Sequence, residues 1–140
     1  MTAAEDLPES LGRFNLFADL ARPQLEAIAD TDWERWYTDG ERVLRRGMSG
    51  SGFYVILDGQ AIVQIDGDER SRLRAGDFFG EVSTLLGEGP TADIVAAGPM
   101  RCLEIPGPQL EAFLLDYPRV MLRMLQTEAR RLQEALEWRT

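Results

Sequence analysis

Residues 78–96, FFGEVSTLLGEGPTADIVA, have the types and the spacing needed to hold an anion. The apolar turn at FFG leads into EVSTLL, which the sequence predicts to be a short helix. The consecutive backbone N–H groups from Gly80 to Ser83 then lie at the start of that helix, where they and the helix dipole face an anion. We therefore expect a phosphate-binding loop made mainly of backbone groups.

Few other residues in the chain have the chemistry of a catalytic or metal site. The sequence contains no histidine and one cysteine, Cys102, which excludes Ser/His/Asp and Cys/His nucleophile pairs, His-rich zinc sites and thiolate clusters. The 24 acidic residues are typical of a solvated surface in so acidic a chain. We expect a protein that is not an enzyme, with no catalytic residue, no metal and no resident cofactor.

The charge of the chain limits its partners. The formal net charge is -9, and all 15 basic residues are arginine. Such a molecule repels a polyanion, so we expect no nucleic-acid partner. No apolar segment approaches the roughly 20 residues that cross a bilayer, and the start MTAAEDLPES is unlike a signal peptide. We expect no membrane partner and a cytoplasmic location.

The periodicity of apolar residues divides the chain into three parts. With 140 residues, of which 44% are hydrophobic, it suits a single domain, 1–140, with one core. Apolar residues recur at helical intervals over about 7–36, which predicts two short helices. The period becomes two over about 41–106, and it returns to helical over about 108–138, with a break at Pro118.

The central part is predicted to be a set of short antiparallel strands. Asp58-Gly59 and Asp66-Gly67 are dipeptides that accept the positive φ of tight hairpin turns. Many short strands at regular spacing indicate a mainly β sandwich, barrel or jelly roll.

The chain has glycines at positions 40, 47 and 59 around the predicted strands, and the motif GDFFGE at 76–81. With these motifs, the chain from about residue 11 to about residue 125 resembles the cyclic nucleotide-binding domain family, the module of catabolite-activator-type regulators, kinase regulatory subunits and cyclic-nucleotide-gated channels. The resemblance implies an eight-stranded jelly roll, or β-roll, with flanking N-terminal and C-terminal helices. It also implies a phosphate cassette at 76–95 and cAMP or cGMP as ligand.

The resemblance assigns roles within the cassette. The family's glutamate, here Glu81, accepts a hydrogen bond from the ribose 2′-hydroxyl, and a small residue, here Ser83, lets the phosphate close on the backbone. The family's arginine, in a Pro-Arg pair, neutralises the phosphate, but here Pro90 is followed by threonine. Asp93 stands where the family has a small neutral residue, and it would repel a phosphate if its side chain points inward. The predicted ligand-binding residues are Gly80, Glu81, Val82, Ser83, Thr91 and Ala92.

Three interpretations of the missing arginine stay open. Another arginine replaces it, the candidates being Arg70, Arg72, Arg74, Arg123, Arg130 and Arg131. For the first three, a solvent-facing strand is the favoured interpretation, because alternate charged positions are typical of a half-exposed strand. Alternatively, the site takes a different ligand that depends less on a cation, or the pocket is empty and the fold is an interaction scaffold.

The last helix carries leucines at coiled-coil spacing. The stripe consists of Leu122, Leu125, Ala129, Leu132 and Leu136. Its steps of 3 and 4 fit a dimer seam or a face packed on the domain's own β surface. Near the end of the helical lead, Trp33, Trp36 and Tyr37 are interpreted as core or interface residues.

The sequence as a whole indicates a stand-alone regulatory sensor with weak, altered or lost cyclic nucleotide binding. Its signal would pass through the C-terminal helix to a protein partner or a second copy. The alternative is a ligand-free scaffold or adaptor that uses the fold for protein–protein interaction or dimerisation.

Overall fold

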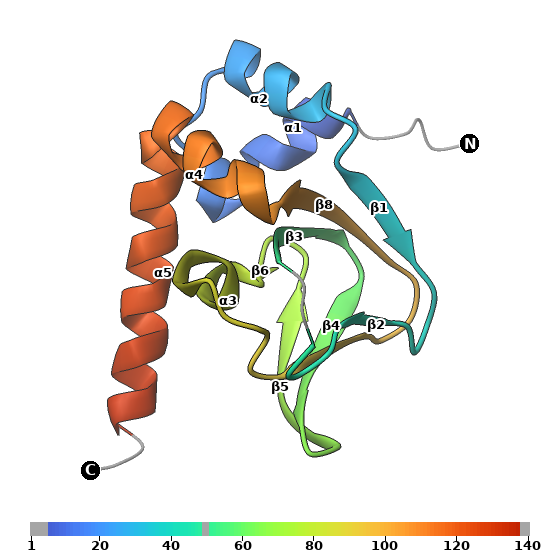
Figure 1. The fold of residues 1–140 in the computed structure, drawn as a ribbon. Helices are drawn as coiled ribbons and strands as arrows, with labels where there is room; N and C mark the ends of the chain where they lie inside the picture. The colour runs from blue at the N-terminus through green and yellow to red at the C-terminus, as the bar shows by residue number, and fades with distance from the viewer. Residues whose placement is uncertain (1–5, 49–50, 138–140) are drawn as a thin grey trace. The chain divides into compact units, whose positions relative to one another are not determined.

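The computed structural model describes residues 6–48 and 51–137 of the chain, which form two compact units (Figure 1). We call residues 31–111 the β unit, and residues 1–30 together with 112–140 the helical unit. No helix in the described ranges is both long enough and apolar enough to span a membrane.

The β unit contains two four-stranded sheets in which all neighbouring strands are antiparallel. The first sheet has the order β1 (Glu34–Tyr37), β8 (Met100–Pro106), β3 (Gly52–Asp58) and β6 (Phe78–Phe79). The second has the order β2 (Arg42–Leu44), β7 (Asp93–Ala96), β4 (Gln60–Ile65) and β5 (Asp68–Arg74). The predicted eight-stranded jelly roll with flanking helices is confirmed.

Alternation along the strands determines which side chains face the interior of the roll. In β7, Ile94 and Ala96 are buried, whereas Asp93 and Val95 are half-buried, as expected when successive side chains point to opposite faces of a sheet. The hairpin between β4 and β5 turns at Asp66, with φ 55°, and Gly67, with φ 81°, as the Asp-Gly dipeptide predicts.

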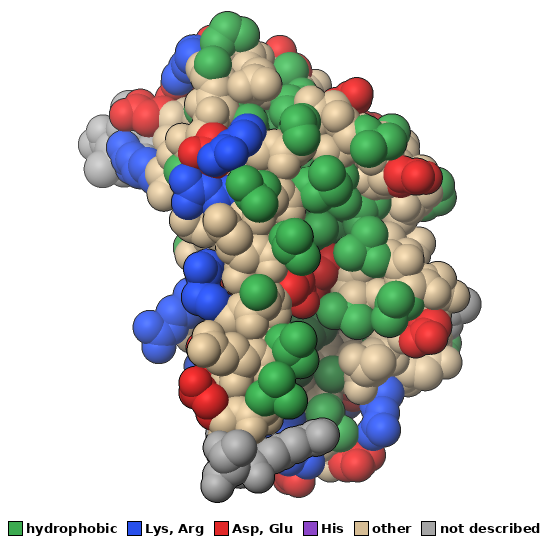
Figure 2. Space-filling view, turned by 90° about the vertical axis from the view of Figure 1, so that its left-hand side faces the viewer, with side chains coloured by type: hydrophobic (Ala, Val, Ile, Leu, Met, Phe, Trp, Pro, Cys, Tyr) green, Lys and Arg blue, Asp and Glu red, His purple; other side chains and the backbone are tan. Residues whose placement is uncertain are grey.

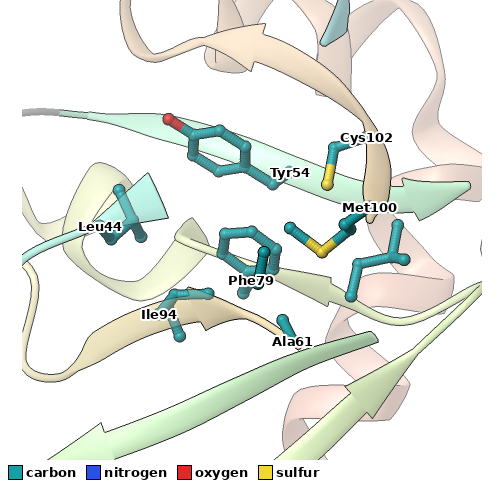
Figure 3. Close-up of a cluster of buried hydrophobic side chains, with 9 residues drawn as sticks. Leu44, Tyr54, Ala61, Phe79, Ile94, Met100 and Cys102 are labelled. Carbon is teal, nitrogen blue, oxygen red and sulfur yellow. The ribbon is translucent and has the colours of Figure 1, made fainter. Parts of the chain in front are cut away.

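The interior of the roll is a packed apolar cluster with side chains from both sheets (Figure 3). Its members are Leu44, Tyr54, Ile56, Ala61, Phe79, Ile94, Ala96, Met100 and Cys102. The rings of Tyr54 and Phe79, on neighbouring strands, lie nearly parallel with their centroids 4.8 Å apart. Stacked aromatic rings of this kind contribute beyond the area that they bury.

The helical unit contains the first helices and the last one. These are α1 (Leu7–Gly12), the 3-10 turn η1 (Asn15–Phe17), α2 (Arg22–Ala29) and α5 (Pro118–Glu137), while α4 (Gly107–Asp116) leads out of the β unit. Pro23 lies in the first turn of α2, where its missing N–H costs nothing, and Pro118 begins α5 for the same reason. Arg123 of α5 joins this helix to η1 by donating to Asn15 Oδ1 at 2.9 Å.

The prediction that helical structure extends to residue 36 was wrong. The last helix of the lead ends at Ala29, and Glu34–Tyr37 is strand β1, which pairs with β8. Non-local pairing decides this segment, because bulky aromatic residues suit a strand and β8 offers a partner edge. Trp36 is 68% exposed, so of the two predicted roles, core or interface, the core role is excluded for this residue.

Candidate functional site

Gly80 sets the start of the cassette helix α3 (Glu81–Leu86). Its φ is 86°, in the left-handed region that favours glycine, and a Cβ at this position would collide with the carbonyl oxygen of Gly52 and lie 3.1 Å from the ring of Tyr54. The chain can therefore pass this close to β3 only with glycine at position 80. The backbone N–H groups of Glu81, Val82 and Ser83 lie in the first turn of α3. N–H groups in the first turn of a helix have no carbonyl partner within that helix.

Two polar side chains of α3 are buried. Glu81 is 3% exposed and Ser83 is 7% exposed, whereas Val82 between them is 44% exposed. The hydroxyl of Ser83 donates to the carbonyl of Gly80 at 3.4 Å, which closes the first turn. The structure thus groups the predicted residues from Gly80 to Ser83 in one turn. The Val82 side chain is exposed, so it does not share the buried position of its two neighbours.

Thr84 attaches α3 to β3. Its hydroxyl accepts the N–H of Gly52 at 2.9 Å and donates to the carbonyl of Gly52 at 3.1 Å. This side chain satisfies both backbone groups of one strand residue, which is the form of side chain-to-backbone pairing that fixes a local position. Sequence reasoning did not single out Thr84, because its partner is 32 residues away.

The second half of the cassette is held by the turn at residues 45–48. Pro90 is buried, and its carbonyl accepts the N–H of Gly47 at 3.0 Å. Thr91 is exposed and Ala92 is half-buried. These two predicted residues therefore belong to a loop anchored from the other side, distinct from the turn at the start of α3.

Asp93 has a structural role at the end of this loop. Its Oδ1 accepts the backbone N–H of Arg46 at 2.7 Å, and its Oδ2 lies 4.0 Å from the guanidinium of Arg42. The side chain occupies the face of β7 opposite to the buried Ile94, so it points away from the interior of the roll. Asp93 was expected to repel a phosphate only if its side chain points inward, and it does not point inward.

Three titratable side chains in or against the interior cluster of the roll are uncharged at neutral pH. Burial raises the pKa of Tyr54 and of Tyr37 well above the usual range of a phenol, and burial raises the pKa of the Cys102 thiol to about 12. All three groups keep their protons at neutral pH. In the described part of the chain, no three His, Cys, Asp or Glu side chains gather as metal ligands.

A pocket of about 370 Å³ borders the cassette helix. Its lining residues are Ser51, Ser83, Thr84, Gly87, Glu88, Gly89 and Gly107. Of the predicted site residues only Ser83 lines it, and its one charged side chain is the carboxylate of Glu88. This hollow supplies hydroxyl groups but no cation.

The sequence profile of the cyclic nucleotide-binding domain matches residues 34–117, which include the whole cassette. The chain belongs to the cyclic nucleotide-binding domain family. The cGMP-dependent protein kinase egl-4 of Caenorhabditis briggsae is 39% identical over 95 residues, which cover 64% of this chain and 13% of the kinase. The chain thus spans a small part of the curated relatives that it matches.

Solved structures show the same relationship. The catabolite activator protein of Thermus thermophilus is 28% identical with a TM-score of 0.77, over 89% of this chain and 61% of that one. The regulatory subunit of a cAMP-independent protein kinase A from Trypanosoma brucei is 23% identical with a TM-score of 0.75, over 94% of this chain and 51% of that one. This second likeness concerns the fold alone.

In this cyclic nucleotide-binding domain the arginines of β5 lie on the outside of the roll. Arg70, Arg72 and Arg74 are exposed and alternate with Leu73, which packs against the interior cluster. Arg72 also binds Glu69, with 3.1 Å between Nε and Oε2. Both observations support the solvent-facing interpretation of these three arginines.

The arginines of α5 named as substitutes also have partners, either on their own helix or in the turn that follows η1. Arg123 binds both carboxylate oxygens of Asp19 at 2.9 Å, Arg131 binds Glu128 at 3.0 Å, and Arg130 donates to Thr127 at 3.3 Å. Sequence reasoning missed the two arginines next to Asp93, namely Arg42 and Arg46. Gly47 marks this turn in the sequence and was the available signal for it. The hydrogen bond between Arg46 and Asp93, however, joins residues 47 positions apart, which a local pattern does not reveal.

Proposed function

We propose that this cyclic nucleotide-binding domain is a regulatory sensor that binds cAMP or cGMP weakly. The ligand-binding residues are Gly80, Glu81, Val82, Ser83, Thr91 and Ala92. The first turn of α3 would receive the phosphate, and the buried carboxylate of Glu81 would accept from the ribose, as the family resemblance implies. The observation that carries the weakness is an exposed threonine, Thr91, directly after the buried Pro90.

The loss of the guanidinium sets the expected affinity. A charge-assisted hydrogen bond contributes about 1.5–3 kcal/mol, and each 1.4 kcal/mol is about a factor of ten. A nucleotide held at about 1 μM by a complete cassette would then bind here at about 10–150 μM. Within the described residues, the contacts of Arg72, Arg123 and Arg131 with carboxylates support this proposal, since moving any of them would break an ion pair.

Fold similarity alone does not decide ligand binding, since one of the similar structures is the regulatory subunit of a protein kinase A described as cAMP-independent. Thermal unfolding with cAMP, cGMP and cyclic dinucleotides at millimolar concentration decides it, with 5′-AMP as the non-cyclic control. At about 1 mM, a ligand with a Kd of about 10–150 μM stabilises the folded state by about 1.2–2.7 kcal/mol, which is several degrees in Tm. If no cyclic nucleotide raises the Tm above that with 5′-AMP, this proposal is wrong.

We further propose that the signal leaves through α5 to a second copy of the chain. The apolar stripe of α5 is exposed at Leu122, Leu125, Leu132 and Leu136, and Figure 2 shows hydrophobic side chains on the side where α5 lies in Figure 1. The residues directly after the seam positions Leu125 and Leu132 are the neutral Gln126 and Gln133. These two flanking positions therefore carry no charge that would repel α5 of a second copy.

Sedimentation equilibrium tests the dimer. The pair of substitutions Leu125→Asp and Leu132→Asp should convert a dimer to a monomer, because it introduces charge into the seam. Arg130→Asp, at an exposed position outside the stripe, is the control and should leave the mass unchanged. A wild-type chain that sediments as a monomer at all concentrations would leave the stripe as the surface for a different protein, and the homodimer would be wrong.

A further inference from the structure

A second concave site lies in the β unit, built from residues outside the cassette. It is a hollow of about 320 Å³ lined by Trp36, Tyr37, Asp58, Pro99, Met100 and Arg101. Strand register places Trp36 of β1 opposite Arg101 of β8, and Asp58 of β3 opposite the same arginine. Three neighbouring strands thus bring an indole, a guanidinium and a carboxylate to one place.

The indole of Trp36 is conspicuous because it is 68% exposed. Tryptophan combines a large apolar face with little conformational entropy, and it is enriched where proteins hold partners. Here it stands at the edge of a hollow that also contains the ring of Pro99. An exposed aromatic wall of this kind offers a flat face to a planar or cationic group.

The charges in the hollow favour a cationic occupant. Arg101 binds Asp58 at 2.7 Å and Glu34 at 3.4 Å, so two carboxylates share one guanidinium. Both of its contacts with Asp58, from Nε at 2.9 Å and from the terminal nitrogen at 2.7 Å, use Oδ2. Arg101 therefore fixes the carboxylate of Asp58 in place, while that side chain stays 68% exposed. Glu34 does not line the hollow, but the cluster of Arg101, Asp58 and Glu34 has a net charge of -1, in a chain whose net charge is -9.

We propose that this hollow is a docking site for an arginine side chain on a basic segment of a partner protein. The guanidinium of the partner lies on the indole of Trp36 and pairs with the carboxylate of Asp58. Arginine fits better than lysine, because its planar group stacks on an aromatic ring and presents paired N–H donors to a carboxylate. The site is independent of the nucleotide cassette, and the test needs no nucleotide.

The full chain, labelled with ¹⁵N, is titrated with a hexa-arginine peptide while NMR follows the indole N–H signal of Trp36. Loss of one signal in the Trp36→Phe variant assigns that resonance. We expect the signal to shift and saturate with hexa-arginine, to shift less with hexa-lysine, and to stay in place with hexa-glutamate. For Asp58→Asn we expect binding about three- to fivefold weaker, from the loss of one partly exposed ion pair.

The matched control is Asp66→Asn. Asp66 is also an exposed carboxylate paired with an arginine, Arg46 at 3.2 Å, but it lies on the β4–β5 hairpin. Its substitution removes the same charge and should leave the affinity for hexa-arginine unchanged. Equal weakening by the two substitutions would show general attraction to an acidic protein and overturn the site. Equal shifts with hexa-lysine and hexa-arginine, or a fixed Trp36 signal, would overturn it as well.

Discussion

Thr91→Arg should restore tight cyclic nucleotide binding to this cassette. The backbone at this position is already held, because the carbonyl of the preceding Pro90 accepts the N–H of Gly47 at 3.0 Å. Thr91 is exposed, so a longer side chain can enter without displacing the core. Asp93 must be left in place, since Asp93→Ala would remove the acceptor that holds the N–H of Arg46 at 2.7 Å.

The expected gain follows from the chemistry of the new contact. A guanidinium that reaches a phosphate makes charge-assisted hydrogen bonds of about 1.5–3 kcal/mol, which corresponds to about 10- to 150-fold tighter binding. Isothermal titration calorimetry with cAMP and with cGMP measures this difference directly. The Kd of the variant should fall from about 10–150 μM toward about 1 μM.

Two controls separate a local contact from a general change in charge. Thr91→Gln adds length without charge and should gain clearly less than Thr91→Arg, about 3- to 12-fold at most, since a neutral hydrogen bond contributes about half as much free energy. Leu85→Arg adds the same charge on the exposed side of α3 and should have a small effect. If Leu85→Arg strengthens binding as much as Thr91→Arg, or if Thr91→Arg gives no gain, then position 91 does not face the phosphate.

Three further predictions concern the framework around the site. Gly80→Ala should destabilise the fold by more than the roughly 1–2 kcal/mol that a left-handed backbone costs a non-glycine residue, because the new Cβ also meets the carbonyl of Gly52. Gly87→Ala is the control, since Gly87 has φ 69° and open space around it, and should show the backbone cost alone. Equal changes in the urea midpoint of the two variants would contradict the steric argument. The hydrogen bond from Arg123, with help from Arg119, lowers the pKa of Asp19 to about 2, so the ion pair stabilises the helical unit above about pH 4 and is lost as the pH falls toward 2. The Tm difference between the wild type and Asp19→Asn should therefore shrink over that range, and a constant difference would show that the carboxylate charge is irrelevant. The Cys102 thiol is fully buried, with a pKa raised to about 12, so iodoacetamide should label it only as fast as the β unit unfolds.

The strands and the cassette helix could be predicted because their signals are local. Alternating apolar residues and the Asp66-Gly67 turn define β4 and β5, and EVSTLL after Gly80 matches α3 from Glu81 to Leu86. These patterns depend on backbone geometry that a residue shares with its near neighbours.

The errors came from contacts between distant parts of the sequence. The segment at Trp36 became strand β1 because β8, more than 60 residues later, offers an edge, and the local pattern carries no trace of that edge. The effect of Asp93 on a phosphate was predicted only on the condition that its side chain points inward, and its orientation depends on a backbone N–H 47 residues earlier, which the local sequence does not reveal. No sequence signal showed that Thr84 would satisfy both backbone groups of Gly52.

Gly47 and Gly52 mark the two ends of one short stretch of chain, and each end is fastened to a different half of the cassette. Gly47 holds the carbonyl of Pro90, and Gly52 is held by the hydroxyl of Thr84. Each half of the cassette is therefore anchored within the β unit through a contact of its own. A substitution that removes the hydroxyl of Thr84 would release α3 from β3 and leave the loop after Pro90 held by Gly47.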